Sequence, residues 1–269
     1  MTVPPPTGPP PTETAPAPVL AADEVTVVFG HGRRAQTVLD NVSVAVPKGT
    51  TLGLVGESGS GKSTLAKAMV GLVRPRSGRI LLDGRDVSGL RGSKLTEVRR
   101  RVQLISQDPN SSLNPRMRIG RALAEAIDPR RARADRAAIA RGLEMVALDA
   151  DAADRYPHEF SGGQRQRIAI ARALVAEPDI VVADEITSAL DCSVQAEVLN
   201  LLAGLRARLG LTMLFISHDL AVVRHVSDAV AVMRHGVIVE QGRIYDAPAH
   251  PYTRRLLASA PSLPAKEPS

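Results

Sequence analysis

Residues 56–63 read GESGSGKS, which matches the phosphate-loop pattern G-x-x-x-x-G-K-[ST]. Residues 51–55 form an apolar run that indicates a buried strand, and residues 63–73 carry apolar side chains at helical spacing. The pattern therefore lies between a strand and a helix, which is the context that the motif requires. A dinucleotide-binding fingerprint fits less well, because Thr64 stands where that pattern needs its third glycine.

The loop residues are suited to binding the phosphates of a nucleotide. Glycines let the backbone wrap closely round an anion, so that amide groups and the N-terminus of the next helix point at phosphate oxygens. We expect the ammonium of Lys62 to reach the β- and γ-phosphates of ATP and the hydroxyl of Ser63 to coordinate Mg²⁺. The expected nucleotide-binding residues of the loop are Gly56, Glu57, Ser58, Gly59, Ser60, Gly61, Lys62, Ser63 and Thr64. A chance glycine-rich turn is a weaker interpretation in this context.

Residues 180–185 read IVVADE, an apolar strand that ends in two carboxylates. We expect Asp184 to hold Mg²⁺ and Glu185 to orient or deprotonate the attacking water, since phosphoryl transfer depends on positioning and charge neutralisation. Alone, the stretch would be interpreted as a solvated acidic turn after a buried strand. Together with a phosphate loop earlier in the chain, it resembles a Walker B strand.

The wider pattern predicts an α/β fold. Apolar residues alternate at positions 25, 27 and 29 and again at 42, 44 and 46, which predicts an antiparallel sheet. Apolar strands expected at residues 102–106, 180–183 and 212–217 alternate with helical segments, as in a largely parallel sheet. Ligands of such sheets bind beyond the carboxyl ends of the strands.

Residues 110–176 lack strand signals and are rich in alanine, arginine and leucine, so we expect an inserted helical subdomain there. The arginines at positions 130, 131, 133 and 136 are best explained as a solvated helix or loop face.

The composition limits the function further. The 269 residues suffice for one large domain with a subdomain. The balance of 34 basic to 28 acidic residues is weak evidence for nucleic-acid binding, and the 2% aromatic content leaves few rings for stacking on bases. The single cysteine, Cys192, excludes an intrachain disulfide and indicates a reducing compartment.

The N-terminal sequence predicts a cytoplasmic protein with a disordered tail. No stretch of about 18 or more apolar residues is present, and the N-terminus lacks the layout of a signal peptide. Residues 1–20 contain eight prolines and one charged residue, Glu13, a composition that favours extended, solvated chain. We also expect disorder at residues 263–269.

Residues 160–164, Phe-Ser-Gly-Gly-Gln, carry the resemblance to a known family. They resemble the LSGGQ signature of ABC ATPases, with phenylalanine in place of leucine, and the Arg-Gln-Arg that follows strengthens the likeness. In that family the motif faces the nucleotide of the partner subunit, which implies nucleotide contacts for Ser161, Gly162 and Gly163. A serine and two glycines ahead of a helix, expected at residues 164–176, also expose amides and a hydroxyl to phosphate.

Other positions resemble further motifs of the family. Gln107 resembles the Q-loop glutamine, which contacts Mg²⁺ or water and links the site to the helical subdomain. Residues 188–191, SALD, resemble the D-loop, and His218 resembles the switch histidine near the γ-phosphate. By the same resemblance Phe29 is the ring expected to stack on adenine, although one apolar residue on a strand is usually part of a core.

One position departs from the family pattern. Ile186 follows the expected catalytic glutamate, where the family usually has proline. Because both carboxylates are intact, we expect ATP hydrolysis to be retained. Losing the fixed φ of proline should affect the rate of hydrolysis rather than abolish it.

Two stretches are similar to the ATPases of oligopeptide, dipeptide and nickel importers. They are QDP at residues 107–109 followed by SLNPR at 112–116, and HPYTR at residues 250–254. SQDP, YPHEFSGGQRQR at residues 156–167 and SALD are similar to the second ATPase of such systems, which usually pairs with a similar first one.

The resemblance covers residues 22–262 and implies a phosphate-loop NTPase with a RecA-like core, an antiparallel β subdomain and an inserted α-helical subdomain. It implies an ATPase domain over residues 21–262 with a His-Pro-Tyr segment at 246–262, and ATP and Mg²⁺ as ligands. The implied partners are a second ATPase subunit in a head-to-tail homo- or heterodimer, two transmembrane permeases and an extracytoplasmic solute-binding protein. The chain would then lie on the cytoplasmic face of the membrane and bind no nucleic acid.

Two other functions stay open from the sequence. A soluble ABC ATPase acting on nucleic acid or ribosomes commonly carries two ATPase cassettes, long coiled-coil inserts or zinc-binding cysteines, none of which this sequence contains. A scaffold that binds ATP without turnover is disfavoured by Glu185 and His218. A serine hydrolase is excluded, because Ser217, His218 and Asp219 are consecutive and cannot converge as a triad.

Overall fold

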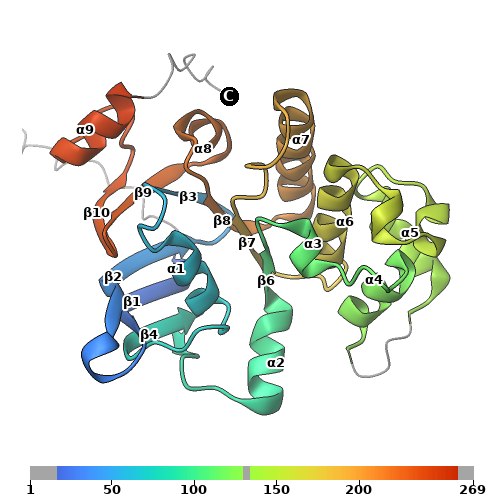
Figure 1. Ribbon diagram of the computed structural model, residues 1–269, viewed down its shortest axis with the longest axis horizontal. Helices are drawn as coiled ribbons and strands as arrows, with labels where there is room; N and C mark the ends of the chain where they lie inside the picture. The colour runs from blue at the N-terminus through green and yellow to red at the C-terminus, as the bar shows by residue number, and fades with distance from the viewer. Residues whose placement is uncertain (1–16, 130–133, 260–269) are drawn as a thin grey trace, which may run out of the picture.

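Two β-sheets organise the structure, a computed structural model that describes residues 17–129 and 134–259 (Figure 1). The larger sheet has the strand order β10-β9-β3-β8-β7-β6. Its neighbouring strands are parallel except for β9 and β10, so the predicted α/β fold with a largely parallel sheet is confirmed. The strands are β3 (Thr51–Val55), β6 (Val102–Ile105), β7 (Ile180–Asp184), β8 (Thr212–Ile216), β9 (Ala229–Arg234) and β10 (Val237–Gly242).

The central strands β3, β7 and β8 are buried along their whole length. A strand covered on both faces has no solvent-facing side, which explains why these sequences are mainly apolar and do not alternate between apolar and polar residues. The same property made them the clearest strands in the sequence.

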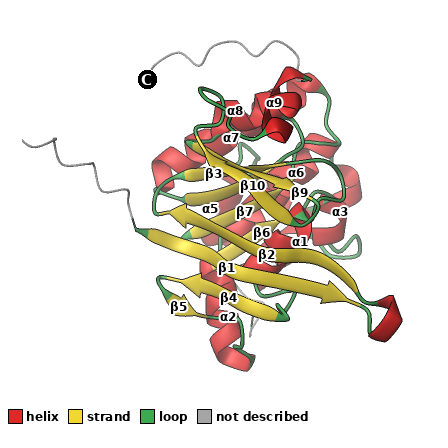
Figure 2. Cartoon of the chain, turned by 90° about the vertical axis from the view of Figure 1, so that its left-hand side faces the viewer, coloured by secondary structure: helices red, strands yellow, loops and turns green. Residues whose placement is uncertain are grey.

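The smaller sheet is antiparallel and has the order β2-β1-β4-β5. Figure 2 shows its long strands β1 and β2 running below the larger sheet. The alternating valines of these two strands are buried, which confirms the predicted antiparallel sheet. The strands are β1 (Pro18–Phe29), β2 (Gln36–Pro47), β4 (Ser77–Leu82) and β5 (Arg85–Asp86).

Helices cover both faces of the larger sheet. Helix α1 lies between the two sheets, where its buried side chains share one apolar cluster with strands of both. Helices α6, α7 and α8 contribute to the apolar cluster on the opposite face. The helices are α1 (Lys62–Met69), α2 (Gly92–Arg101), α3 (Pro109–Ser112), α4 (Ile119–Ile127), α5 (Arg136–Glu144), α6 (Gly162–Leu174), α7 (Cys192–Leu209), α8 (Leu220–Val226) and α9 (Pro251–Ala258), with short 3₁₀ helices η1 (Gly32–Arg34), η2 (Ala150–Asp154) and η3 (Pro157–Glu159).

The stretch expected to form a helical insert contains α3 to α6, which gather beyond the β6 edge of the sheet (Figure 1). Arg136 is exposed and pairs with Asp154 at 3.0 Å, in keeping with a solvated face. The arginines at 130, 131 and 133 lie outside the described residues. No helix within the described ranges has both the length and the apolar character needed to cross a membrane.

Three expected boundaries differ from the structure. Strand β1 begins at Pro18, inside the expected tail, because Val19 and Leu20 are buried; residues 1–16 and 260–269 lie outside the described part. Helix α1 ends at Met69, shortly before Gly71 takes a φ of 70°. Helix α6 begins at Gly162, because the side chain of Ser161 caps it.

Gly53 of β3 gives a test of how closely this strand packs on α8. A methyl group added at Gly53 would lie 2.3 Å from Val223 Cγ1 and 2.6 Å from Ser227 Oγ. Gly53→Ala should therefore lower the free energy of unfolding by about 1–3 kcal/mol, the usual cost of overpacking.

The matched control is Gly204, an exposed position within α7 where an added carbon meets nothing within 4 Å. Gly204→Ala should raise the free energy of unfolding by about 0.5–1 kcal/mol. Urea unfolding of both variants measures the difference, and equal effects would contradict the close approach of β3 and α8.

Candidate active site

Four neighbouring parallel strands bring the expected catalytic residues to one edge of the larger sheet. The phosphate loop follows β3 and Gln107 follows β6, while Asp184 and Glu185 come at the end of β7 and His218 follows β8. Since β3, β8, β7 and β6 are adjacent and point the same way, their carboxyl ends meet at this edge.

The phosphate loop is folded around the side chain of Lys62, which is 4% exposed. Its ammonium donates hydrogen bonds to the backbone oxygens of Gly56 at 2.9 Å and Glu57 at 3.0 Å. A side chain at Gly56 would place Cβ 2.1 Å from the carbonyl oxygen of Met233, so only glycine fits there. The loop therefore holds its cation in place with its own backbone.

Ser63 and Asp184 lie together next to the phosphate loop. The hydroxyl of Ser63 donates a hydrogen bond to Asp184 Oδ1 at 3.1 Å. Burial raises the pKa of the Asp184 carboxyl, and although the Ser63 hydrogen bond lowers it, the negative charge of Glu185 raises it further. A hydroxyl and a buried carboxylate are hard oxygen donors, the ligands that Mg²⁺ prefers.

Glu185 is held between two cationic or potentially cationic side chains. Its carboxylate oxygens lie 3.7 Å from Lys62 Nζ and 3.5 Å from His218 Nδ1. Its backbone takes a φ of 48°, a strained conformation for a residue with a side chain, and its amide donates to Ile216 O at 2.9 Å. The side chain of the next residue, Ile186, is 2% exposed and belongs to the main apolar cluster.

Gln107 reaches the turn after Glu185 rather than Asp184. Its amide nitrogen donates to the hydroxyl of Ser188 at 3.2 Å, and that hydroxyl donates to the backbone oxygen of Glu185 at 3.0 Å. The sequence placed Ser188 in the D-loop but did not predict this link. The expected Q-loop residue and the turn that contains Glu185 are therefore connected through one serine.

The signature residues form the capped N-terminus of α6. The Ser161 hydroxyl accepts from the Gln164 amide at 3.3 Å, and the Ser161 amide donates to Gln164 Oε1 at 3.0 Å. A Cβ on Gly163 would lie 2.4 Å from Val194 Cγ1, so packing on α7 requires glycine. In Figure 1, α6 and α1 lie on opposite sides of β7, so the structure does not bring this signature to its own phosphate loop.

The ring of Phe29 lies at the end of β1 and is 47% exposed. The alternative that it belongs to a core is therefore wrong. Its contact with adenine stays a prediction.

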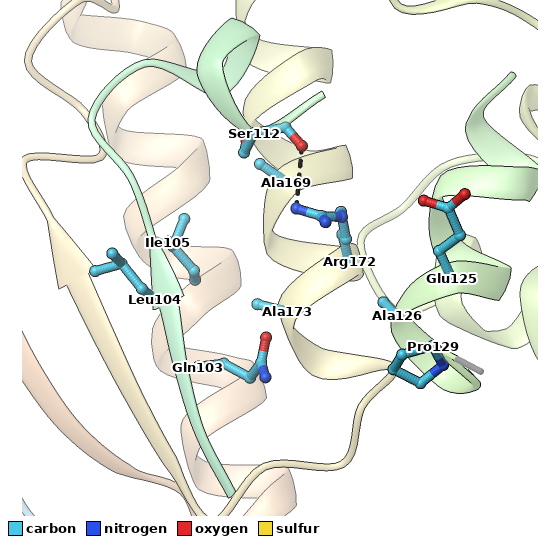
Figure 3. Close-up of a pocket in the computed structure, with 10 residues that line it drawn as sticks. All are labelled: Gln103, Leu104, Ile105, Ser112, Glu125, Ala126, Pro129, Ala169, Arg172 and Ala173. Carbon is cyan, nitrogen blue, oxygen red and sulfur yellow. Dashed lines mark hydrogen bonds between the residues drawn. The ribbon is translucent and has the colours of Figure 1, made fainter. Parts of the chain in front are cut away.

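A cavity of about 380 Å³ lies apart from these residues, between β6 and helices α4 and α6 (Figure 3). Arg172 crosses it and donates to the backbone oxygen of Ser112 at 3.0 Å. Its lining contains none of the residues expected to bind the nucleotide.

Sequence comparison gives three findings. A profile of the ABC transporter family matches residues 39–188. A Brucella ovis protein, named provisionally as a peptide import ATP-binding protein, is 53% identical over 231 residues, which cover 84% of this chain and 73% of that protein. The dipeptide transport ATP-binding protein DppF of Lactococcus lactis is 47% identical over 259 residues, covering 93% of this chain and 83% of that one.

Solved structures of similar fold include MJ0796, a bacterial ABC transporter cassette solved as a dimer. It superposes with a TM-score of 0.74 at 28% identity, covering 82% of this chain and 97% of that chain. A post-hydrolysis state of the same cassette, with ADP and phosphate bound, has a TM-score of 0.72.

The buried Asp184 leads to a stability prediction. Because burial raises its folded-state pKa, its charge becomes a cost to the folded state as the pH rises above the unfolded value of about 3.9. Asp184→Asn removes that charge and keeps an oxygen for the Ser63 hydrogen bond. It should therefore raise the thermal unfolding midpoint of the nucleotide-free protein near neutral pH.

The gain from Asp184→Asn should shrink near pH 4, where protonation removes the charge from the wild-type carboxyl as well. Thermal unfolding of the wild type and the variant near pH 7 and near pH 4 measures this change in the gain. A variant less stable than the wild type at neutral pH would contradict the cost assigned to burial.

Proposed function

The chain belongs to the ABC transporter family and hydrolyses ATP, and from this premise we propose that it is the ATPase subunit of an importer of peptides, nickel or related small solutes. The names of the Brucella and Lactococcus relatives support peptides as the cargo. The HPYTR sequence at residues 250–254, similar to that of the same importers, is a second support.

One observation supports the catalytic assignment above all others. The Glu185 carboxylate lies 3.7 Å from the Lys62 ammonium and 3.5 Å from the His218 imidazole, at the edge where the phosphate loop begins. A base, a phosphate-binding cation and a second polar group are thus within reach of one phosphoryl group.

The proposed reaction is the attack of water on the γ-phosphorus of ATP. Glu185 orients the water and accepts its proton, and the bond from the γ-phosphorus to the bridging oxygen breaks, giving ADP and phosphate. Lys62 balances the charge on the β- and γ-phosphates, while His218 contacts the γ-phosphate. The loop residues 56–64 bind the phosphates through their amides, and Phe29 stacks on adenine.

We assign Ser63, Asp184 and Gln107 to a Mg²⁺ ion, which would neutralise phosphate charge when bound. The Ser63 hydroxyl and Asp184 carboxylate fit this role because they are already 3.1 Å apart. Gln107 presents its amide nitrogen to Ser188, which leaves its amide oxygen for the metal or a water.

The partners follow from the separation of the two nucleotide-binding elements. Since the signature at residues 161–163 lies away from the chain's own phosphate loop, it would complete the site of a second ATPase subunit in a head-to-tail dimer. The dimeric MJ0796 cassette supports a second ATPase subunit as the partner. We further propose two permease subunits, a solute-binding protein outside the membrane, and a peripheral position on its cytoplasmic face.

Replacing the proposed base should separate binding from chemistry. Glu185→Gln keeps the shape of the side chain but removes the proton acceptor, so ATP should stay bound while hydrolysis falls by about 10²-fold or more. Lys62→Ala is the matched control, because it removes the cation and should lower both ATP affinity and turnover. Turnover of Glu185→Gln within a few-fold of wild type would clear Glu185 of the role.

The transport assignment is tested with the same variant in a strain that lacks this gene. The wild-type chain should restore uptake of a labelled dipeptide or of Ni²⁺, and Glu185→Gln should not. Normal uptake of both solutes in the deletion strain would contradict the importer assignment while leaving the ATPase assignment intact.

The head-to-tail arrangement predicts which site a signature variant disables. Ser161→Arg should spare ATP binding to the isolated chain but block hydrolysis at the partner's site, where the arginine would intrude on the γ-phosphate. Lys62→Ala in the same chain should instead disable the chain's own site. Site-resolved turnover in mixed dimers decides the point: if Ser161→Arg inhibits the site that contains this chain's Lys62, the arrangement is wrong.

A further inference from the structure

The hairpin formed by β9 and β10 contacts the phosphate loop directly. The amide of Gly236, in the hairpin turn, donates to the backbone oxygen of Ser60 at 2.9 Å. The carbonyl oxygen of Met233 fills the space that a side chain on Gly56 would need. The hairpin therefore touches the loop near both of its ends, and a shift of the turn would move the backbone that surrounds Lys62.

The C-terminal residues 249–254, which we call the C-terminal cap, hold this hairpin. The carboxylate of Glu240 on β10 accepts hydrogen bonds from the amide of Ala249 at 2.6 Å and the amide of His250 at 3.0 Å. Although burial raises the pKa of Glu240, these hydrogen bonds leave it below its ordinary value. The carboxylate therefore stays ionised and holds the chain before α9 against β10.

The His-Pro-Tyr residues of the cap are fitted to the start of α9. His250 Nδ1 accepts from the Tyr252 amide at 3.1 Å, which caps the helix, and Pro251 occupies its first position, where a missing amide costs nothing. The helix then carries Tyr252 into the interior, where the residue is 4% exposed.

Tyr252 connects the cap to the end of β9. The guanidinium of Arg234, the last residue of β9, lies 4.9 Å from the centre of the Tyr252 ring. Burial raises the pKa of the Tyr252 hydroxyl. No atom of the described residues forms a hydrogen bond with that hydroxyl, so the contact with Arg234 depends on the ring.

We propose that the C-terminal cap positions the phosphate loop for nucleotide binding, with Glu240 and Tyr252 as positioning residues that act through the β9–β10 turn. The contacts that link them run from the cap to the hairpin and from the hairpin to Ser60 and Gly56. This role is independent of the solute that the importer carries. It requires only that the loop binds ATP.

The test measures the dissociation constant of the isolated full chain for ATP with Mg²⁺ by titration calorimetry. Tyr252→Ala and Glu240→Ala should each weaken binding by roughly 2- to 30-fold, the range seen when coupling between linked sites is perturbed. Tyr252→Phe keeps the ring and should bind as the wild type does. Glu240→Gln keeps one acceptor oxygen, so its affinity for ATP should lie between those of the wild type and Glu240→Ala.

Leu123→Ala is the control for lost stability alone, because Leu123 is fully buried in α4, away from the loop. It should lower the unfolding midpoint without changing ATP affinity. Amide exchange of residues 57–62 should be faster in Tyr252→Ala and Glu240→Gln than in Leu123→Ala. Wild-type affinity in Tyr252→Ala and in both Glu240 variants, or an equal loss in Leu123→Ala, would overturn the proposal and leave the cap as a cover for the hairpin.

Discussion

The burial of the Lys62 ammonium under the phosphate loop is the constraint on which the rest of the site depends. A buried cation is costly unless polar groups surround it, and here two loop carbonyls bond it while a carboxylate lies 3.7 Å away. Those carbonyls can face inward only if the loop turns back on itself against the end of β9, where glycine alone fits at position 56. The strand order that puts β9 beside β3 therefore helps to shape the phosphate loop.

The turn at Asp184 and Glu185 combines a strained backbone with a buried carboxyl group. Glu185 holds a left-handed backbone conformation, which costs of order 1–3 kcal/mol and persists only where the surroundings enforce it. The hydrogen bond from the Glu185 amide to Ile216 of β8 and the burial of the adjoining Ile186 hold the backbone of Glu185 in this conformation. An anchored side chain therefore fixes this turn in a chain that lacks the proline usual in the family. Asp184 adds the cost of a buried charge, so the proposed catalytic carboxylates are fixed in place at a cost to stability.

Much of this arrangement could be predicted from the sequence, for identifiable reasons. The buried strands β3, β7 and β8 are mainly apolar, so their positions and the residues at their carboxyl ends were evident. The β9–β10 hairpin was missed, although the pair His235-Gly236 between two apolar runs is a recognisable hairpin signal. The bond from Gln107 to Ser188 was out of reach, because it depends on side-chain conformations that spacing does not encode. The exposure of Phe29 likewise follows from where β1 ends in space, which its local sequence does not specify.

The two helix ends proposed to bind phosphate are built differently, and in the proposed dimer this difference explains why one chain would form half a site. Helix α1 begins under a loop whose donors include a full cation, so it can bind phosphate without help. Helix α6 offers only a hydroxyl and backbone amides, with its capping serine already bonded to Gln164. Donors of that strength contribute mainly once a strongly charged group is placed against them. In the proposed dimer, ATP held by one chain's Lys62 presents its γ-phosphate to the other chain's α6, so the nucleotide itself joins the subunits. In that proposed dimer, loss of the γ-phosphate would remove the group that α6 binds, and hydrolysis would be coupled to reopening through the nucleotide alone.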